Sequence, residues 1–370
     1  MRVVAIDLLR LELDLRIPLL TSAGEHRHRP LVLLRVVTDE AVGYGECSAL
    51  AEPTYTEEYA DGAEAVLRAH LIPRVMATRA DLSTAEALEL LGPVHGHKMA
   101  KAGVEMALLD AELRASSMSL AAFLGATHRT IPAGANVSLG TPDSVVAAVA
   151  LVVDAGYRRV KVKIAPGFDV DVLEAVRAAF PEVALSADAN GSYDLMNGEH
   201  RVALQRMDAL GLACFEQPLP AGDLEGAAAL CRLAQTPVIL DESIASMSDF
   251  DNAVALGALD GVSIKPARIG GLLAGKTLHD RASALGLSLS IGGMLESGVG
   301  RAAAIALGAL AGFNLPGDLG GSDRYFDPDL TAPHVLVDGG LAVPSAPGIG
   351  VALDEDVLSS VTRRSERFTH

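Results

Sequence analysis

Charged residues close several short apolar runs in the second half of the chain. The runs are KVKI at 161–164, SADAN at 186–190, FEQP at 215–218, LDES at 240–243 and KPAR at 265–268. Asp188, Glu216 and Asp241 end three consecutive runs, and lysines end the runs on either side. A charge at the end of a run of Val, Ile and Ala is costly to bury unless it is paired or binds a metal ion. Singly, each carboxylate could be a helix N-cap, but their shared position favours a common site.

These three carboxylates form a ligand set made of oxygen atoms alone. No Cys or His ends the same runs. Hard divalent cations prefer such ligands, Mg²⁺ before Mn²⁺, whereas zinc favours nitrogen and sulfur. The sequence therefore predicts a magnesium site at Asp188, Glu216 and Asp241.

Lysines on both sides of the carboxylates suit proton transfer. Lys161 and Lys163 alternate along a strand pattern, so their side chains share one face. Mutual repulsion and a nearby cation should lower the pKa of one of them toward neutrality and make it a usable base. Because a metal ion stabilises an enediolate, this arrangement suits removal of the proton α to a carboxylate.

A repeat of short strands and helices must position these residues. From residue 131 onward, eight β-branched runs recur about every 25 residues, with Ala- and Leu-rich stretches of helical period between them. Each period holds one strand, one helix and two short loops. The stretch 141–156 opens with Thr-Pro-Asp and closes on Gly156, as a capped helix does. Successive βα units predict a TIM-type barrel with its chemistry at the carboxyl ends of the strands.

The first 125 residues lack this rhythm. They indicate a β meander over 3–15, 31–38 and 42–47, followed by helices that include 98–117. After the barrel, VLVDGGLAVP predicts a hairpin that turns at 338–340. We therefore expect an α/β fold: a modified TIM barrel of the (β/α)7β type with an N-terminal α+β capping domain that the C-terminal segment completes. The expected limits are 1–125 for the capping domain, 126–322 for the barrel and 323–370 for the returning segment.

Motifs along nearly the whole chain resemble the muconate-lactonising branch of the enolase superfamily. Closest is the o-succinylbenzoate synthase / N-succinylamino acid racemase family, to which GYGECSALAEPTYTEEY, SADANGSY, IGGMLESGVGR and GDLGGSDRYF are similar. The resemblance implies that Asp188, Glu216 and Asp241 bind Mg²⁺. It implies that Lys163 and Lys265 are the acid/base pair.

The same resemblance implies roles for further residues. Substrate binding falls to Lys161, Arg268, Gly293 and Met294, and Asn190 and Glu242 support the metal ligands. Segments 19–29 and 49–59 would cap the mouth of the barrel. Arg268 either tunes the pKa of Lys265 or forms an ion pair with a neighbouring acid. The pair Gly292-Gly293 lets backbone groups approach a ligand closely, and Glu296 is best explained as the start of a helix.

Two reactions of this family share one enediolate. Syn elimination of hydroxide yields o-succinylbenzoate in menaquinone biosynthesis, and transfer of one proton between faces racemises an N-acylamino acid. The chain alone does not separate this lyase activity from the racemase activity. A dipeptide epimerase, or another enzyme like muconate cycloisomerase, is the alternative. An epimerase is disfavoured because Asp318-Leu-Gly lacks the second Asp of the expected Asp-x-Asp.

Two hypotheses come from other classes of protein. Gly270 to Thr277 fits the P-loop pattern G-x-x-x-x-G-K-[ST], which suggests a nucleotide hydrolase. However, the acidic strand precedes this loop, and Lys163, Asp188 and Glu216 would have no role. A catalytically inactive barrel that serves as a binding module is disfavoured by the intact set of ligands and lysines.

Composition restricts the partners and the compartment. With 30 Lys+Arg against 47 Asp+Glu, the formal net charge is −17, so a nucleic-acid partner is not expected. Three scattered cysteines fit a reducing compartment, and the acidic residues near the N-terminus do not fit a signal peptide. No run of about 18 uncharged apolar residues predicts a membrane span. We expect a cytoplasmic homo-oligomer that binds a small carboxylate substrate.

Overall fold

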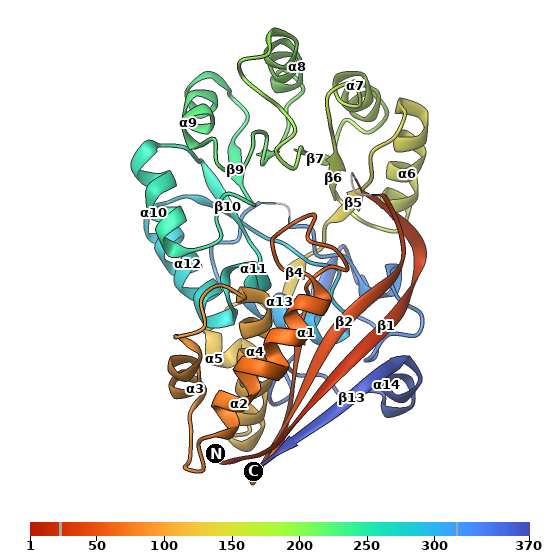
Figure 1. Cartoon of the computed structure of the whole chain (residues 1–370). Coiled ribbons are helices and arrows are strands. Elements are labelled where there is room, and N and C mark those ends of the chain that lie inside the picture. Colours follow the sequence, from red (N-terminus) through yellow and green to blue (C-terminus); the bar gives the residue numbers. More distant parts are fainter. Residues whose placement is uncertain (22–23, 316) are drawn as a thin grey trace.

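A four-stranded antiparallel sheet forms the base of the molecule (Figure 1). The computed structural model describes residues 1–21, 24–315 and 317–370. The order of the strands in this sheet is β13-β1-β2-β3. Their bounds are Val3–Thr21 (β1), Gly24–Thr38 (β2), Val42–Cys47 (β3) and Thr362–Thr369 (β13). The first three strands fall where the sequence predicts a meander.

Helices of the capping domain pack on this sheet or on the helices that cover it (Figure 1). They are α1 (Ala60–Val66), a π turn η1 (Leu67–Leu71), α2 (Ile72–Met76), α3 (Thr84–Leu91), α4 (Lys98–Ala115) and α5 (Leu120–Leu124). Helix α4 lies directly on β3 because two strand positions are glycines. A Cβ atom on Gly45 would lie 2.1 Å from the carbonyl oxygen of Gly103, and one on Gly43 would lie 2.2 Å from that of Ala107. Close backbone contact therefore requires glycine at both positions.

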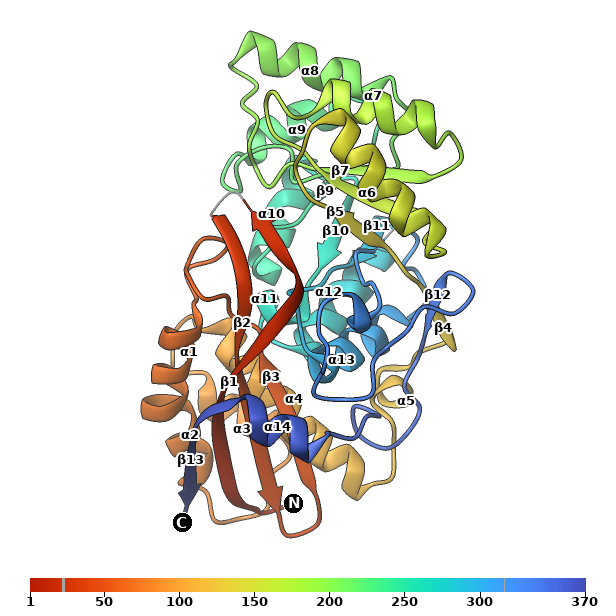
Figure 2. The ribbon, with the colours of Figure 1, turned by 90° about the vertical axis from the view of Figure 1, so that its right-hand side faces the viewer.

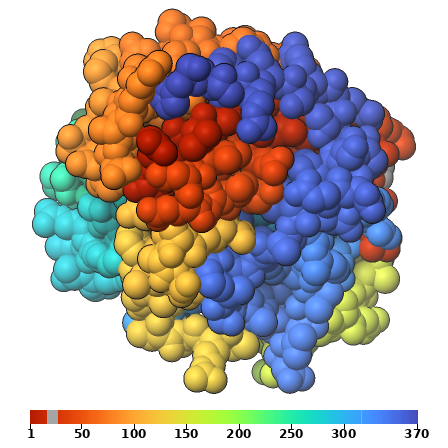
Figure 3. Space-filling model, turned by 90° about the horizontal axis from the view of Figure 1, so that it is seen from below, coloured from red at the N-terminus to blue at the C-terminus, as the bar shows by residue number. Residues whose placement is uncertain are grey.

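The C-terminal segment returns to the capping sheet, as predicted. Strand β13 pairs antiparallel with β1, with Ala5 opposite Thr369 and Leu9 opposite Ser365. Helix α14 (Glu355–Val361) leads directly into β13. Figure 3 shows the C-terminal chain, in blue, lying against the N-terminal strands and helices, in red and orange. Residues at the two ends of the sequence thus build one sheet.

A curled parallel sheet of seven strands forms the second part of the molecule (Figure 2). The strands follow one another in chain order, so each βα unit lies beside the next. They are β5 (Ala135–Val137), β6 (Arg159–Lys163), β7 (Ala184–Asp188), β8 (Phe215–Glu216), β9 (Val238–Leu240), β10 (Gly261–Ile264) and β11 (Ser288–Ile291). The predicted (β/α)7β-type fold with its capping domain is confirmed.

Helices pack on the outside of this sheet (Figure 2). They are α6 (Pro142–Asp154), α7 (Val170–Ala179), α8 (Gly198–Asp208), α9 (Leu224–Leu233), α10 (Met247–Leu256), α11 (Pro266–Ile269), α12 (Leu272–Ala284) and α13 (Gly298–Gly308). Helix α6 begins after an N-cap at Thr141, whose hydroxyl accepts from the Ser144 amide, as the Thr-Pro-Asp sequence predicts.

The eighth predicted strand is not a strand in the described part of the chain. Phe313 forms only an isolated parallel bridge to Leu289. The segment nevertheless fills the gap, because the Asp318 amide donates to the Ile291 carbonyl and the Gly134 amide donates to the Leu319 carbonyl. A proline, which has no amide hydrogen, interrupts this run and removes a donor from any ladder. Irregular backbone thus links β11 to the chain before β5.

The predicted hairpin at 335–344 is reduced to its turn. Val337 and Gly340 form a single antiparallel bridge. Strand β12 (Gly340–Ala342) then pairs with β4 (Thr130–Pro132), which precedes the barrel. The turn residues were predicted correctly, but the partner of the second arm is a distant segment. A short 3₁₀ turn at Ser322–Arg324 completes the elements.

No helix among residues 1–21, 24–315 and 317–370 combines the length and the apolarity that a bilayer crossing requires.

Candidate active site

The three predicted metal ligands lie side by side at the carboxyl ends of neighbouring strands. Asp188 ends β7, Glu216 ends β8, and Asp241 follows β9. The register pairs Asp188 directly with Glu216. All three side chains are buried. The parallel sheet therefore brings together residues that are about 25 positions apart in sequence.

Ammonium groups lie against the first two carboxylates. The Lys161 Nζ is 3.0 Å from Asp188 Oδ2 and 2.8 Å from Glu216 Oε1. The Lys163 Nζ is 2.7 Å from the same Asp188 oxygen, and it also donates to Asn190 Oδ1. Both lysines belong to β6 and approach one side of the carboxylate row, as strand alternation predicts.

Lys265 approaches the row from the opposite side. It follows β10, and its Nζ is 2.7 Å from Asp241 Oδ2. The guanidinium of Arg268 also contacts the Asp241 carboxylate and anchors itself on the carbonyls of Ile244 and Ser263. Arg268 forms the predicted ion pair with a neighbouring acid, here Asp241, and its charge also acts to lower the pKa of Lys265, the other role considered. Lys163 and Lys265 thus flank the carboxylates, with β7, β8 and β9 between their strands.

The charges of this cluster shift one another's pKa values. Burial disfavours the charge of Asp188, but the ammonium groups of Lys161 and Lys163 outweigh it and hold its pKa well below the ordinary range. The pKa of Asp241 is lowered in the same way, because the positive charges of Arg268 and Lys265 outweigh the effect of burial. Burial raises the pKa of Glu216 to about 7, although Lys161 acts against this rise.

The prediction of a lowered pKa concerned one of the two lysines on β6, and the pKa of Lys161 is raised. Burial acts to lower this pKa, yet the carboxylates of Asp188, Asp318 and Glu216 together raise it well above its ordinary value. The depression expected from two neighbouring lysines does not occur at Lys161, because three carboxylates surround its ammonium group. The pKa of Lys265 is raised as well: burial acts against this, and Asp241 supplies the largest opposing effect.

The donor set fits a hard cation by its chemistry. Three carboxylates on neighbouring strands supply only oxygen atoms, and at present cationic side chains lie between them. Within the described residues, no three acidic, histidine or cysteine side chains converge closely enough to enclose an ion as they stand. A metal ion held by these three carboxylates would therefore replace the ammonium groups that now contact them.

Asn190 and Glu242 connect two of these strand ends. Asn190 Nδ2 donates to Glu242 Oε1 at 2.7 Å, and the Asn190 amide donates to Asp188 Oδ1. Asn190 has φ of 43°, a left-handed conformation that Asn tolerates better than most residues. The second carboxylate oxygen of Glu242 is buried without a partner, and burial raises the pKa of this residue. The two residues lie next to the carboxylate row, as predicted.

The turn after β11 closes the third side of the site. A Cβ atom on Gly292 would lie 2.7 Å from Cε of Lys265, so any side chain there would displace this lysine. The Gly293 amide donates to Asp318 Oδ1 at 2.7 Å. Met294 packs with the core of the capping domain. Glu296 precedes α13, as predicted, and pairs with the buried Arg301 at 3.2 Å.

Two further residues belong to the cluster and were not predicted as members. Tyr55, from the capping domain, accepts from Lys265 Nζ at 2.9 Å and from Arg268 at 2.7 Å. Asp318 accepts from Lys161 Nζ at 3.1 Å. The family resemblance implied that segment 49–59 caps the site, but no spacing rule singled out Tyr55, the first tyrosine of PTYTEEY.

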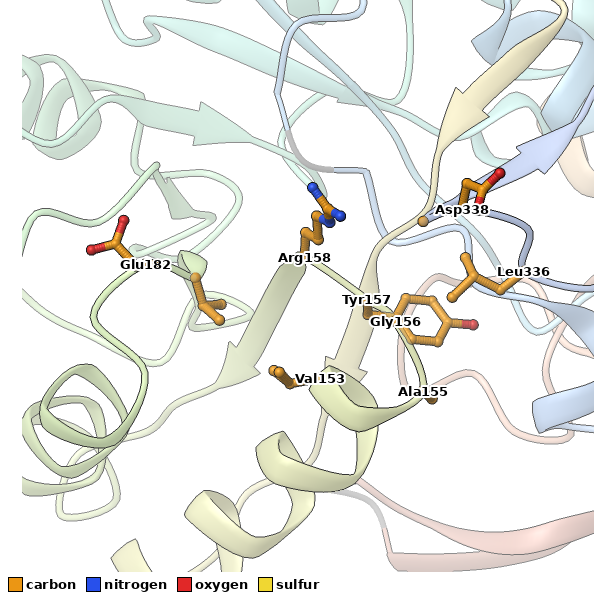
Figure 4. Close-up of a pocket in the computed structure, with 10 residues that line it drawn as sticks. Val153, Ala155, Gly156, Tyr157, Arg158, Glu182, Leu336 and Asp338 are labelled. Atoms are coloured by element: carbon orange, nitrogen blue, oxygen red, sulfur yellow. The ribbon is translucent and has the colours of Figure 1, made fainter.

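A hollow of about 360 Å³ opens beside this cluster. Its lining includes Tyr55, Lys98, Glu242 and Arg268. The described chain also has a hollow of about 640 Å³ at the opposite end of the sheet, next to the residues that precede β6 and β7. In Figure 4, Glu182 lies at one side of this second hollow and Leu336 with Asp338 at the other. The charged cluster lies at the carboxyl ends of the strands, so the first hollow adjoins the candidate site.

The P-loop hypothesis is wrong. The pattern residues form the turn before α12 and its first part. The amides of Leu272 and Leu273, at the start of α12, donate to the carboxylate of Glu105 from α4. A Cβ atom on Gly271 would lie 2.1 Å from that carboxylate. An internal carboxylate thus fills the position where a P-loop binds phosphate.

Comparison with known proteins identifies the family. The description "Mandelate racemase / muconate lactonizing enzyme, N-terminal domain" matches residues 5–125, and "Enolase C-terminal domain-like" matches residues 144–357. An N-succinylamino acid racemase of Amycolatopsis sp is 45% identical over 98% of each chain. An o-succinylbenzoate synthase of Bacillus subtilis strain 168 is 35% identical, also over 98% of each. A crystal structure of an enolase-superfamily member from Listeria innocua, 36% identical, has a TM-score of 0.94 and covers 100% of this chain and 99% of its own. The chain therefore belongs to the enolase superfamily, in its mandelate racemase / muconate lactonizing enzyme group, as the sequence motifs predicted.

Proposed function

We propose that the chain removes the proton α to a carboxylate with the help of Mg²⁺, as an o-succinylbenzoate synthase, an N-succinylamino acid racemase, or both. One observation carries the proposal: Lys163 and Lys265 flank a buried row of three carboxylates from opposite sides. A substrate held between the two Nζ atoms would present one face to each lysine, of which the neutral amine can take a proton and the ammonium form can give one. The names of the similar proteins support the same pair of reactions.

Enolase-superfamily enzymes generally use a divalent metal ion. In this chain Asp188, Glu216 and Asp241 would hold Mg²⁺, for which Mn²⁺ is a possible substitute. When bound, the ion supplies positive charge that stabilises a developing enediolate. Lys161 would bind the substrate carboxylate, with Arg268 and the turn at Gly293 and Met294 as further walls.

The two lysines would divide the proton transfers. In racemisation, one lysine takes the α-proton from its face and the other returns a proton to the opposite face. In dehydration, one lysine takes the proton and then gives it to the departing hydroxide on the same face. Both paths begin with removal of the α-proton. Racemisation then forms a new C–H bond on the opposite face, whereas dehydration breaks the β C–O bond and releases the hydroxide and the abstracted proton as water, so one site can support both.

Proton exchange in D₂O tests this proposal. We expect the α-proton signals of N-succinylamino acids of both configurations to disappear in the ¹H NMR spectrum when protein and Mg²⁺ are present. Lys163→Ala and Lys265→Ala should each slow turnover about 10²–10⁴-fold. The control Lys276→Ala changes a half-buried lysine on α12 that pairs with Asp280, away from the carboxylate row, and it should keep the wild-type rate.

Product analysis separates the two reactions. Exchange from both enantiomers supports racemisation, whereas formation of o-succinylbenzoate from the cyclohexadiene precursor supports dehydration. Full activity of both lysine variants, with either substrate, would refute the assignment.

The proposal also includes the domain limits 1–125, 126–322 and 323–370, a cytoplasmic location, a homo-oligomer, and the absence of nucleic-acid and membrane partners.

A further inference from the structure

Arg29 on β2 is a buried cation whose donors all bind main-chain carbonyls. Its guanidinium makes five hydrogen bonds, and none of them goes to a carboxylate. Burial lowers the pKa of Arg29. The nearby carboxylates of Glu46 and Glu296 act to raise it, but the net shift is downward. The five acceptors are the carbonyls of Pro30, Ser48, Ala49, Met294 and Leu295.

Two of the five carbonyls belong to the first residues of the loop that carries Tyr55. Arg29 donates to the carbonyls of Ser48 at 2.6 Å and Ala49 at 2.7 Å. The next residue, Leu50, forms a bridge to Tyr59 and closes the base of the loop. Between these ends, the chain reaches the site, where Tyr55 contacts Lys265. Arg29 thus fixes one end of the loop that delivers Tyr55.

The second pair of acceptors lies on the turn after β11. Arg29 donates to the carbonyls of Met294 at 3.0 Å and Leu295 at 3.1 Å. Leu295 has φ of 54°, a conformation that a leucine rarely adopts without support from its surroundings. Within the same turn, Gly293 holds Asp318, which accepts from Lys161. The turn that Arg29 holds is therefore connected, through Asp318, to Lys161, the lysine proposed to bind the substrate carboxylate.

We propose that Arg29 is a positioning residue, which sets the distance between the Tyr55 loop and the turn at 292–295. The inference rests on the proposed function for its catalytic consequence. Arginine suits the task because a planar guanidinium presents five donors in a fixed fork, whereas an ammonium group has three donors and no fixed plane. A lysine at this position would keep the positive charge but could not form hydrogen bonds to both segments at the same time.

A matched control exists in the same chain. Arg177 on α7 also binds main-chain carbonyls of two segments, those of Pro181, Val183, Leu210 and Gly211. These carbonyls lie before β7 and β8, at the amino ends of the strands. Arg177→Lys therefore removes the same kind of clamp away from the candidate site.

Hydrogen exchange tests the clamp without reference to activity. In Arg29→Lys, we expect amide exchange to quicken together in segments 48–58 and 292–297, by about tenfold or more, while α3 keeps its wild-type rate. Arg177→Lys should quicken exchange near 181–183 and 210–211 only. Unchanged exchange in either clamped segment of folded Arg29→Lys would overturn the proposal, and so would a uniform increase throughout the capping domain.

Turnover tests the consequence for catalysis. With N-succinylamino acid and Mg²⁺, Arg29→Lys should lower kcat about 10–100-fold, with a much smaller change in KM, while Arg177→Lys stays within about twofold. Wild-type kcat in Arg29→Lys would refute the positioning role. If the wild type itself exchanges no α-proton, the proposed function fails, and the hydrogen-exchange result still decides whether Arg29 clamps the two segments. Should Arg29→Lys not fold, Arg29→Gln, which keeps a planar donor group, provides the same comparison.

Discussion

Glu105 offers a test of how the capping domain is joined to the barrel. Its carboxylate, on α4, is buried and accepts from the amides of Leu272 and Leu273 at the start of α12. Burial raises its pKa to about 7 from an ordinary 4.5, although these two amides act against the rise. We consider the variant Glu105→Gln, which has the shape of the protonated acid and cannot ionise.

The sign of the effect follows from proton linkage. Because the pKa is higher in the folded state, folding binds a proton, and this contribution to stability is lost as the pH rises through about 7. Between about pH 5 and pH 8, the wild type should lose roughly 2–3 kcal/mol relative to Glu105→Gln. The glutamine variant should therefore gain on the wild type as the solution becomes more alkaline.

Urea unfolding of both proteins at pH 5 and pH 8 measures this difference. The chain has no Trp, so far-UV circular dichroism is the suitable signal. Glu112→Gln is the control, because Glu112 lies on the same helix and accepts from Thr84 within the capping domain. A stability difference between wild type and Glu105→Gln that does not change with pH would refute the reasoning. A change of opposite sign would mean that the start of α12 stabilises the charged carboxylate more than burial disfavours it.

Three further predictions, one of them with a comparison variant, have defined outcomes. Asp241→Asn removes a charge from the proposed ligand set, so calorimetric titration should find Mg²⁺ affinity reduced more than about tenfold; unchanged affinity would contradict its role as a ligand. Gly292→Ala places a methyl group 2.7 Å from Cε of Lys265 and should lower kcat about 10–100-fold, whereas Gly293→Ala, with contacts of 3.2 Å, should cost less; equal rates would argue against the crowding. Gly45→Ala forces α4 away from β3 and should destabilise the protein by about 3 kcal/mol; an unchanged melting temperature would show that the sheet and helix can separate freely.

The local pattern of the sequence was enough to predict most residues of the candidate site. Asp188 and Glu216 were found because a charge at the end of an apolar run has few stable positions other than the rim of a parallel sheet. The same argument found Lys163 and Lys265 on the flanking strands. These predictions needed only the strand spacing, and the structure places the side chains together as that spacing requires.

Contacts between distant segments could not be predicted in this way. Tyr55 comes from the capping loop and meets Lys265 across 210 positions of sequence. Glu105 fills the apparent P-loop across 167 positions. No local period encodes such pairs, because they depend on how the capping domain docks on the barrel.

Local patterns along the chain were enough to predict the strand order, the helices between the strands and the row of carboxylates with lysines on both sides. Periodicity and capping residues are local, so they can be recognised without knowing what packs against them. Only the tertiary structure decided the pKa of Lys161, which rises because Asp318 joins Asp188 and Glu216 around one ammonium group. It also decided that an irregular segment, rather than an eighth strand, lies beside β11. Electrostatic effects and pairing partners depend on distance in space, and that distance is fixed only when the chain has folded.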